Sequence, residues 1–235
     1  MAGNTAGSPA RRSFLSRLAA GMTMIGTAVV AGESSMQAQS TGTTGWQPTR
    51  HPQDDWLDQM AGKHRFIFDT TSPAGLGAAL LYANNFFLAN QSGYGLGNAD
   101  AAVVIVVRHN STSFAYTDAI WSKYGGPLGQ AGNFDDPKTK QRPAINVYNS
   151  TTHAALLPNN GVTLDSLTAR GVHVAVCQMA TRRFAGAVAA ATGGNADRVY
   201  DELVSNLVAN AHVVPAGIVA VNRAQERGYT FAHGG

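Results

Sequence analysis

Cys177, the single cysteine of the chain, has the surroundings that most favour chemistry. It follows the apolar run 172–176 and precedes Arg182 and Arg183, which predicts a strand-to-helix junction at this point. The amides of a helix N-terminus and two nearby guanidinium groups stabilise a thiolate, which is the nucleophilic form of cysteine. Position alone leaves a second interpretation open, because a free cysteine is often a buried structural residue.

Asp69 and His109 also come at the ends of predicted strands. Ligands of open parallel sheets bind outside the carboxyl ends of the strands, so these side chains are candidates for the same site as Cys177. His109 is a candidate for proton transfer, and a Cys–His hydrolase would require Asp69 to orient it. The alternatives are a loop-facing polar role for His109 and capping of the turn 70–72 by Asp69.

Other motifs exclude several classes of site. One cysteine rules out an internal disulfide framework, and the remaining histidines have no metal-ligand spacing. The glycines of residues 93–97 follow a predicted helix and precede a strand, which is the reverse of a phosphate-binding loop. The sequence therefore predicts no cofactor and no metal.

The elements that must position these residues alternate between strand and helix. Strands are predicted at 64–69, 101–107, 145–148, 172–176, 212–214 and 229–232, and helices at 76–91, 114–124, 164–169, 181–191, 196–209 and 217–227. This alternation predicts an α/β fold, a single domain with a mainly parallel sheet flanked by helices. The Gly- and Pro-containing run 125–143 is predicted as a long loop, an insertion that could serve as a lid or contact a partner.

The N-terminus has the pattern of an export signal. Arg11 and Arg12 precede a short apolar stretch, which predicts a twin-arginine (Tat) signal peptide over 1–38 and a periplasmic or otherwise exported protein. We expect a linker over 39–55, a domain over 56–235 and no transmembrane segment after leader removal. Uncleaved anchoring stays open, because neither candidate cleavage position has a clean A-x-A.

The charge balance argues against nucleic-acid binding. Residues 1–38 hold three arginines and one glutamate, a net charge of +2, so only +1 of the overall +3 remains for the rest of the chain. With 44% hydrophobic and 13% charged residues, the chain is also not expected to be disordered. The apparent basicity belongs mostly to the leader, and we expect no nucleic-acid partner.

Three motifs in the last third of the chain resemble the DsrE/DsrF-like family. They are a strand ending in cysteine (171–177), a strand running into V-P-A-G (213–218) and a helix running into Q-x-x-G-Y (225–231). The resemblance implies a DsrE/YchN-like α/β domain and a homo-oligomer, either trimer or hexamer. In some members of that family the cysteine that aligns with Cys177 carries sulfane sulfur as a persulfide.

Two hypotheses follow for the function. In the first, the protein handles sulfane sulfur in the cell envelope: Cys177 is nucleophile and persulfide carrier, Arg182 or Arg183 stabilises the thiolate, and His109 assists proton transfer. Such a protein is a carrier rather than a turnover enzyme, and its partner is a sulfur donor or an envelope protein. In the second, it is a non-enzymatic oligomeric binding or accessory protein with a structural cysteine.

Overall fold

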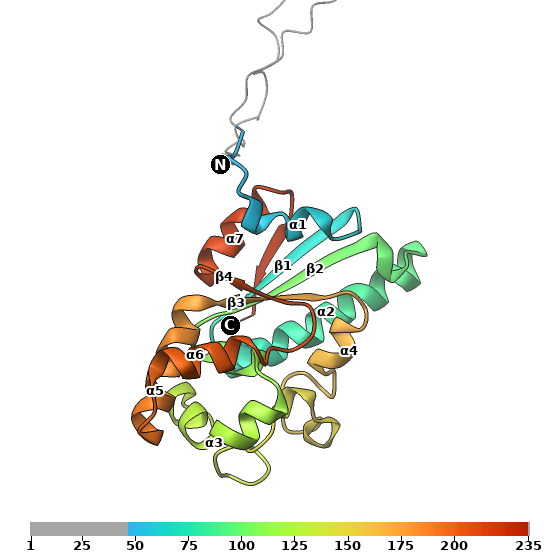
Figure 1. The fold of residues 1–235 in the computed structure, drawn as a ribbon. Helices are drawn as coiled ribbons and strands as arrows, with labels where there is room; N and C mark the ends of the chain where they lie inside the picture. The colour runs from blue at the N-terminus through green and yellow to red at the C-terminus, as the bar shows by residue number, and fades with distance from the viewer. Residues whose placement is uncertain (1–46, 235) are drawn as a thin grey trace, which may run out of the picture. The chain divides into compact units, whose positions relative to one another are not determined.

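A five-stranded parallel sheet forms the centre of the structure (Figure 1). The computed structural model describes residues 47–234, so the predicted leader lies outside the described residues. The strands are β1 (His64–Thr70), β2 (Ala101–Val107), β3 (His173–Cys177), β4 (Ala211–Val214) and β5 (Thr230–His233), in the order β4-β3-β2-β1-β5. Each neighbouring pair is parallel, which confirms the predicted α/β class.

Helices cover both faces of this sheet (Figure 1). They are α1 (Trp56–Gln59), α2 (Pro73–Tyr94), α3 (Asp118–Gly132), α4 (Leu164–Thr168), α5 (Gln178–Thr192), α6 (Ala196–Val204) and α7 (Gly217–Gln225). The larger core cluster joins one face of the sheet to α2, α3, α4 and α5, whereas α1 and α7 pack on the other face. Among residues 47–234, no helix is both long and apolar enough to cross a membrane.

The apolar run of β2 is explained by burial on both faces. Val103 and Ile105 point into the larger cluster, whereas Val104 and Val106 point into the smaller one, and all four are fully buried. Each such side chain stabilises the fold by about 1.5–3 kcal/mol relative to an exposed one. A strand with this pattern can lie only inside a sheet that is covered twice, as the sequence predicted.

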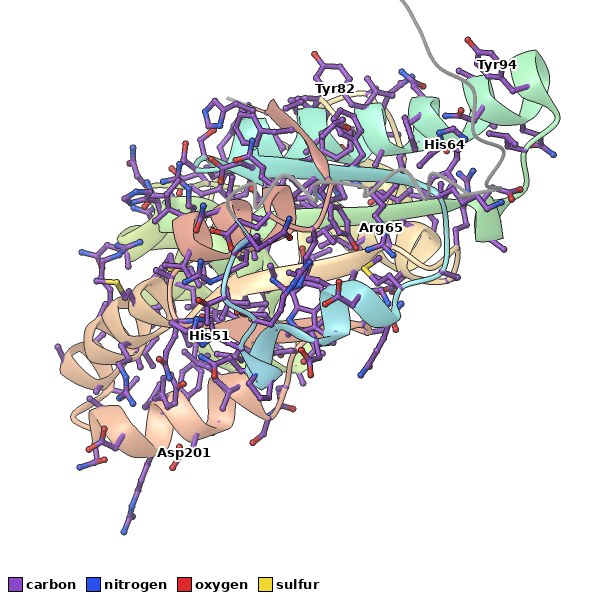
Figure 2. The ribbon with its side chains drawn as sticks, turned by 90° about the horizontal axis from the view of Figure 1, so that it is seen from above. His51, His64, Arg65, Tyr82, Tyr94 and Asp201 are labelled. Carbon is purple, nitrogen blue, oxygen red and sulfur yellow. The ribbon has the colours of Figure 1, made fainter. Side chains whose placement is uncertain are left out.

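Helix α2 is longer at both ends than the predicted 76–91. Ser72 caps its N-terminus by accepting a hydrogen bond from the amide of Gly75 at 2.9 Å, and Pro73 occupies the first turn. At the other end, Gly95 adopts the left-handed conformation with φ of 68°. Tyr82 and Tyr94 project from the solvent side of this helix (Figure 2).

The prediction of a loop from residue 125 onward is wrong, because α3 continues to Gly132. A Cβ atom on Gly125 would lie 1.8 Å from the carbonyl oxygen of Pro143, and one on Gly129 would lie 2.9 Å from Arg142. These glycines let the following loop approach the helix closely. In the sequence alone, glycines that serve close packing look the same as glycines of a flexible loop. The loop that remains is held by Asp136, whose carboxylate contacts His153 Nε2 at 3.0 Å.

The strand predicted at 145–148 is also wrong, since a 3-10 helix forms at Val147–Asn149. The side chain of Asn146 accepts from the amide of Tyr148 at 3.2 Å and donates to the carbonyl oxygen of Phe114 at 2.8 Å. These local bonds replace the ladder bonds of a strand. The predicted helix 114–124 is likewise divided, with a 3-10 helix at His109–Ala115 before α3 begins at Asp118.

Two smaller boundary predictions change as well. The predicted linker already contains a 3-10 helix at Pro52–Asp54, and Asp54 is buried. Helix α6 ends at Val204 instead of residue 209, although Asn195 caps its start as predicted by accepting from the amide of Arg198 at 3.0 Å.

Candidate functional site at the carboxyl ends of the strands

A cavity of about 240 Å³ lies at the carboxyl ends of β2 and β3. It is lined by Arg108 and His109 after β2, by Cys177 and Arg183 around the start of α5, and by the residues that open α7. The structure therefore brings together three residues that the sequence singled out, which are Cys177, His109 and Arg183. The expected position of a site in an open parallel sheet is this same edge.

Cys177 is the last residue of β3 and the residue that precedes the first turn of α5. Its backbone carbonyl accepts a hydrogen bond from Thr181 Oγ1 at 3.0 Å, which fixes the first turn of the helix. The residue is 6% exposed and lines the cavity, so its remaining access is from that side. The predicted strand-to-helix junction is confirmed, and the free amides of α5 begin beside the sulfur-bearing residue.

Arg108 is the functional candidate that sequence reasoning missed. Its Nε and Nη2 atoms donate to the two carboxylate oxygens of Asp69, both at 2.7 Å, across the ends of β1 and β2. This hydrogen bond to Asp69 raises the pKa of Arg108. The signal available in the sequence was an acid and an arginine following two adjacent strands.

Asp69 does not orient His109. Its side chain is 3% exposed, and among the described residues it contacts the guanidinium of Arg108 and, at 3.4 Å, the Nδ1 atom of His233. His109 is exposed and adopts a positive φ of 53°, and its carbonyl oxygen accepts from Arg183 Nη2 at 3.4 Å. The contact that a Cys–His hydrolase requires is therefore not formed, and Asp69 instead positions Arg108.

The two arginines of α5 lie in different surroundings. Arg183 lines the cavity, where it donates to Asn110 Oδ1 at 3.1 Å and to the carbonyl oxygen of Ala131 at 2.9 Å. Arg182 lies outside the cavity, with its guanidinium 4.2 Å above the ring of Tyr200. Of the two predicted thiolate partners, Arg183 is the one that lines the cavity together with Cys177.

The chemistry available at this edge is that of a thiol beside two guanidinium groups. Within residues 47–234, no group of three or more His, Cys, Asp or Glu side chains could hold a metal ion. Arg183 supplies positive charge to a space large enough for a small anion next to Cys177, whereas the charge of Arg108 is balanced by the Asp69 carboxylate. Such a space favours a negatively charged reactant or leaving group.

Comparison with known proteins does not identify a family. No family model matches the chain, and no curated protein matches it. A solved structure, the protein of unknown function MTH1491 from Methanobacterium thermoautotrophicum, is similar over 73% of this chain and 99% of its own, with 15% identity and a TM-score of 0.37.

Proposed function

We propose that this protein carries sulfane sulfur on Cys177 as a persulfide. The observation that supports the proposal most directly is the shared cavity of Cys177, Arg108 and Arg183 at the start of α5. The helix amides and the Arg183 guanidinium attract anionic sulfur donors to this cavity. The cysteine-ending strand and the V-P-A-G segment, which resemble the DsrE/DsrF-like family, supply independent support.

The transfer step is a displacement at sulfur. The Cys177 thiolate attacks the outer sulfur of a donor such as thiosulfate, a new S–S bond forms, and the donor S–S bond breaks. The electron pair of that bond leaves with sulfite, so the products are a cysteine persulfide anion and sulfite. Charge and electrons balance without an added oxidant or proton. When the donor is an organic persulfide, His109 at the same cavity is the candidate for protonating the leaving thiolate.

Intact-mass spectrometry of the reduced protein after incubation with thiosulfate tests the proposal. We expect a one-sulfur adduct that is reversed by dithiothreitol and absent from Cys177→Ala. Arg183→Gln should slow adduct formation at least about tenfold, because it removes the guanidinium that would bind the anionic donor, an interaction worth roughly 1.5–3 kcal/mol. Arg182→Gln is the matched control and should react at the wild-type rate. Resistance of Cys177 to iodoacetamide in the native protein would overturn the proposal.

The rim of the cavity favours a second candidate function, an oligomeric binding or accessory protein. Met179 and Ile218 both line the cavity and are 70% and 57% exposed, so they place two apolar side chains together on its rim. We expect light scattering to report a trimer or hexamer and Met179→Lys to dissociate it. A monomeric wild-type protein would contradict this candidate.

The proposal places the protein outside the cytoplasmic membrane, after export through the Tat pathway. The twin arginines support this location. Replacing both Arg11 and Arg12 by lysine should retain the protein in the cytoplasm in a fractionation assay, whereas Arg17→Lys should leave export unchanged. Export that persists in the double variant would exclude this route.

A further inference from the structure

A second and larger cavity, of about 630 Å³, lies at the amino ends of the strands, at the end of the sheet opposite to Cys177. His173 begins β3 and His212 lies near the start of β4, so the imidazoles stand at the amino ends of these strands. Trp56 from α1 and Arg170, which precedes β3, complete its polar and aromatic walls. This cavity shares no lining residue with the one at Cys177.

His173 and His212 form a flat plate. His173 Nδ1 and His212 Nε2 are 2.8 Å apart, and the two rings are within 6° of coplanar orientation with centroids 5.0 Å apart. The indole of Trp56 stacks on the His212 ring at 4.1 Å and 6°. Since the histidines are joined edge to edge, the plate offers a wide aromatic surface that one small side chain could not provide.

The pair is neutral at pH 7. Burial lowers the pKa of both rings, and that of His212 falls to about 4. In a hydrogen-bonded pair of neutral imidazoles, one ring has an N–H left to donate and the other has a lone pair left to accept. The plate therefore carries a hydrogen-bond donor but no charge of its own.

Arg170 is the charged residue that lines this cavity, and its guanidinium contacts Asn98, which lines the cavity as well. Its guanidinium lies 4.4 Å above the ring of Phe87 and donates to Asn84 Oδ1 at 2.8 Å, with longer contacts to Asn98. Within the described part of the chain, no carboxylate lies within ion-pair distance of Arg170, and no Asp or Glu lines the cavity. A guanidinium has five N–H donors, so these neutral partners leave part of its capacity unused.

We propose that this cavity binds a small aromatic carboxylate. Arg170, which has no ion-pair partner among the described residues, favours an anion over a cation. The rest of the lining combines the polar side chains of Gln59 and Asn98 with Met60 and four alanines beside the Trp56–imidazole stack, and its apolar part favours a flat hydrocarbon ring over a fully hydrated ion. The volume suits a ligand of one or two rings.

Isothermal titration calorimetry with benzoate, benzamide and inorganic phosphate tests this directly. We expect benzoate to bind with a Kd of about 1 mM or below, and the uncharged isostere benzamide to bind at least about tenfold more weakly. Phosphate, which lacks a ring, should also bind at least about tenfold more weakly than benzoate. Equal binding of phosphate and benzoate, or no saturable binding of benzoate, would overturn the proposal without any variant being made.

Variants then locate the site. Arg170→Gln should weaken benzoate binding at least about tenfold, whereas Arg198→Gln, an exposed arginine on α6, should leave it unchanged. Cys177→Ala should also bind benzoate normally, so that failure of this proposal and failure of sulfur transfer are distinguishable. Loss of benzoate binding in Arg198→Gln, or retention in a folded Arg170→Gln, places the ligand elsewhere and contradicts the assignment.

Discussion

The guanidinium of Arg108 and the carboxylate of Asp69 meet in a two-point contact, with Nε–Oδ1 and Nη2–Oδ2 distances that are both 2.7 Å. The contact joins the ends of β1 and β2 and holds Arg108 in the wall of the cavity that contains Cys177. A planar guanidinium held at two points has one orientation, which a lysine could not reproduce. Stability and site geometry therefore depend on the same pair.

Replacing Arg108 by methionine should leave the Asp69 carboxylate buried without its cation. We expect the free energy of unfolding to fall by about 3 kcal/mol, because removing one partner of a buried ion pair leaves an uncompensated charge. Urea denaturation followed by tryptophan fluorescence measures the change. Arg182→Met is the control, since its pairing with the exposed Asp197 should contribute less than about 0.5 kcal/mol. Equal losses in the two variants would contradict this account.

Because Gly217 has no side chain, Arg108 can pack closely against the start of α7. A Cβ atom at this position would lie 2.7 Å from the Cβ atom of Arg108 and 2.9 Å from Val106 Cγ1. We expect Gly217→Ala to lower the free energy of unfolding by about 1–3 kcal/mol and to slow reaction of Cys177 with thiosulfate. In Gly186→Ala, where the added Cβ atom meets nothing within 4 Å inside α5, stability should rise by up to about 1 kcal/mol. An unchanged free energy of unfolding in Gly217→Ala would show that the loop before α7 moves to make room for the added Cβ atom.

Two adjacent glycines of α3, Gly125 and Gly126, test whether the following loop is packed against the helix or is flexible. The Cβ atom of Gly125→Ala would collide with the carbonyl oxygen of Pro143, whereas that of Gly126→Ala would meet nothing within 4 Å. Thermal unfolding should show a loss of at least about 1 kcal/mol for Gly125→Ala and no loss for Gly126→Ala. Similar melting temperatures for both variants would mean that the segment after α3 is not held against the helix.

The His173–His212 pair should make stability depend on pH between about 4 and 6.5. In the folded protein the pKa of His212 is lowered to about 4, mainly by burial and then by His173, whereas an unfolded histidine has a pKa of about 6.5. The unfolded chain therefore binds more protons in this window, so the free energy of unfolding falls as pH decreases from about 6.5 to 4.

His212→Gln should flatten this dependence relative to wild type in urea denaturation at pH 7, 5.5 and 4.5. Around the pair, Trp56 stacks on one face and Arg170 lines the same cavity, and both groups keep their charge state in this range. The exposed His64 provides the control, and His64→Gln should retain the wild-type slope. If the free energy of unfolding of His212→Gln depends on pH as in the wild type, the dependence must arise from other groups.

Local patterns in the sequence were sufficient to locate the five strands and Cys177, although they also predicted a strand at 145–148 that does not form. The β2 run is apolar at every position, and Cys177 stands between a strand pattern and a helix, so neighbouring residues alone define both. The partner of Arg108 is 39 residues away in the chain, and that distance is closed only by the register of β1 against β2. No spacing rule within a single sequence reports such a contact.

The glycines of α3 and the histidine plate were missed for the same physical reason. Gly125 looks like a loop residue unless the approach of Pro143 is known. His173 and His212 had no assigned role, because they meet only when β3 and β4 pair with Ala175 opposite His212. In each case tertiary packing, and not local propensity, decides what the residue does.

Strand β3 has one proposed binding site at each of its ends, with His173 first and Cys177 last. At about 3.3 Å per residue, the two sites are roughly 13 Å apart along a single extended segment. That segment is hydrogen-bonded to β2 on one side and β4 on the other, and its interior residues are fully buried. We expect a segment fixed in this way to transmit little change from one end to the other. A sulfur donor should then leave the affinity for an aromatic acid unchanged, and by thermodynamic reciprocity an aromatic acid should leave the affinity for the sulfur donor unchanged.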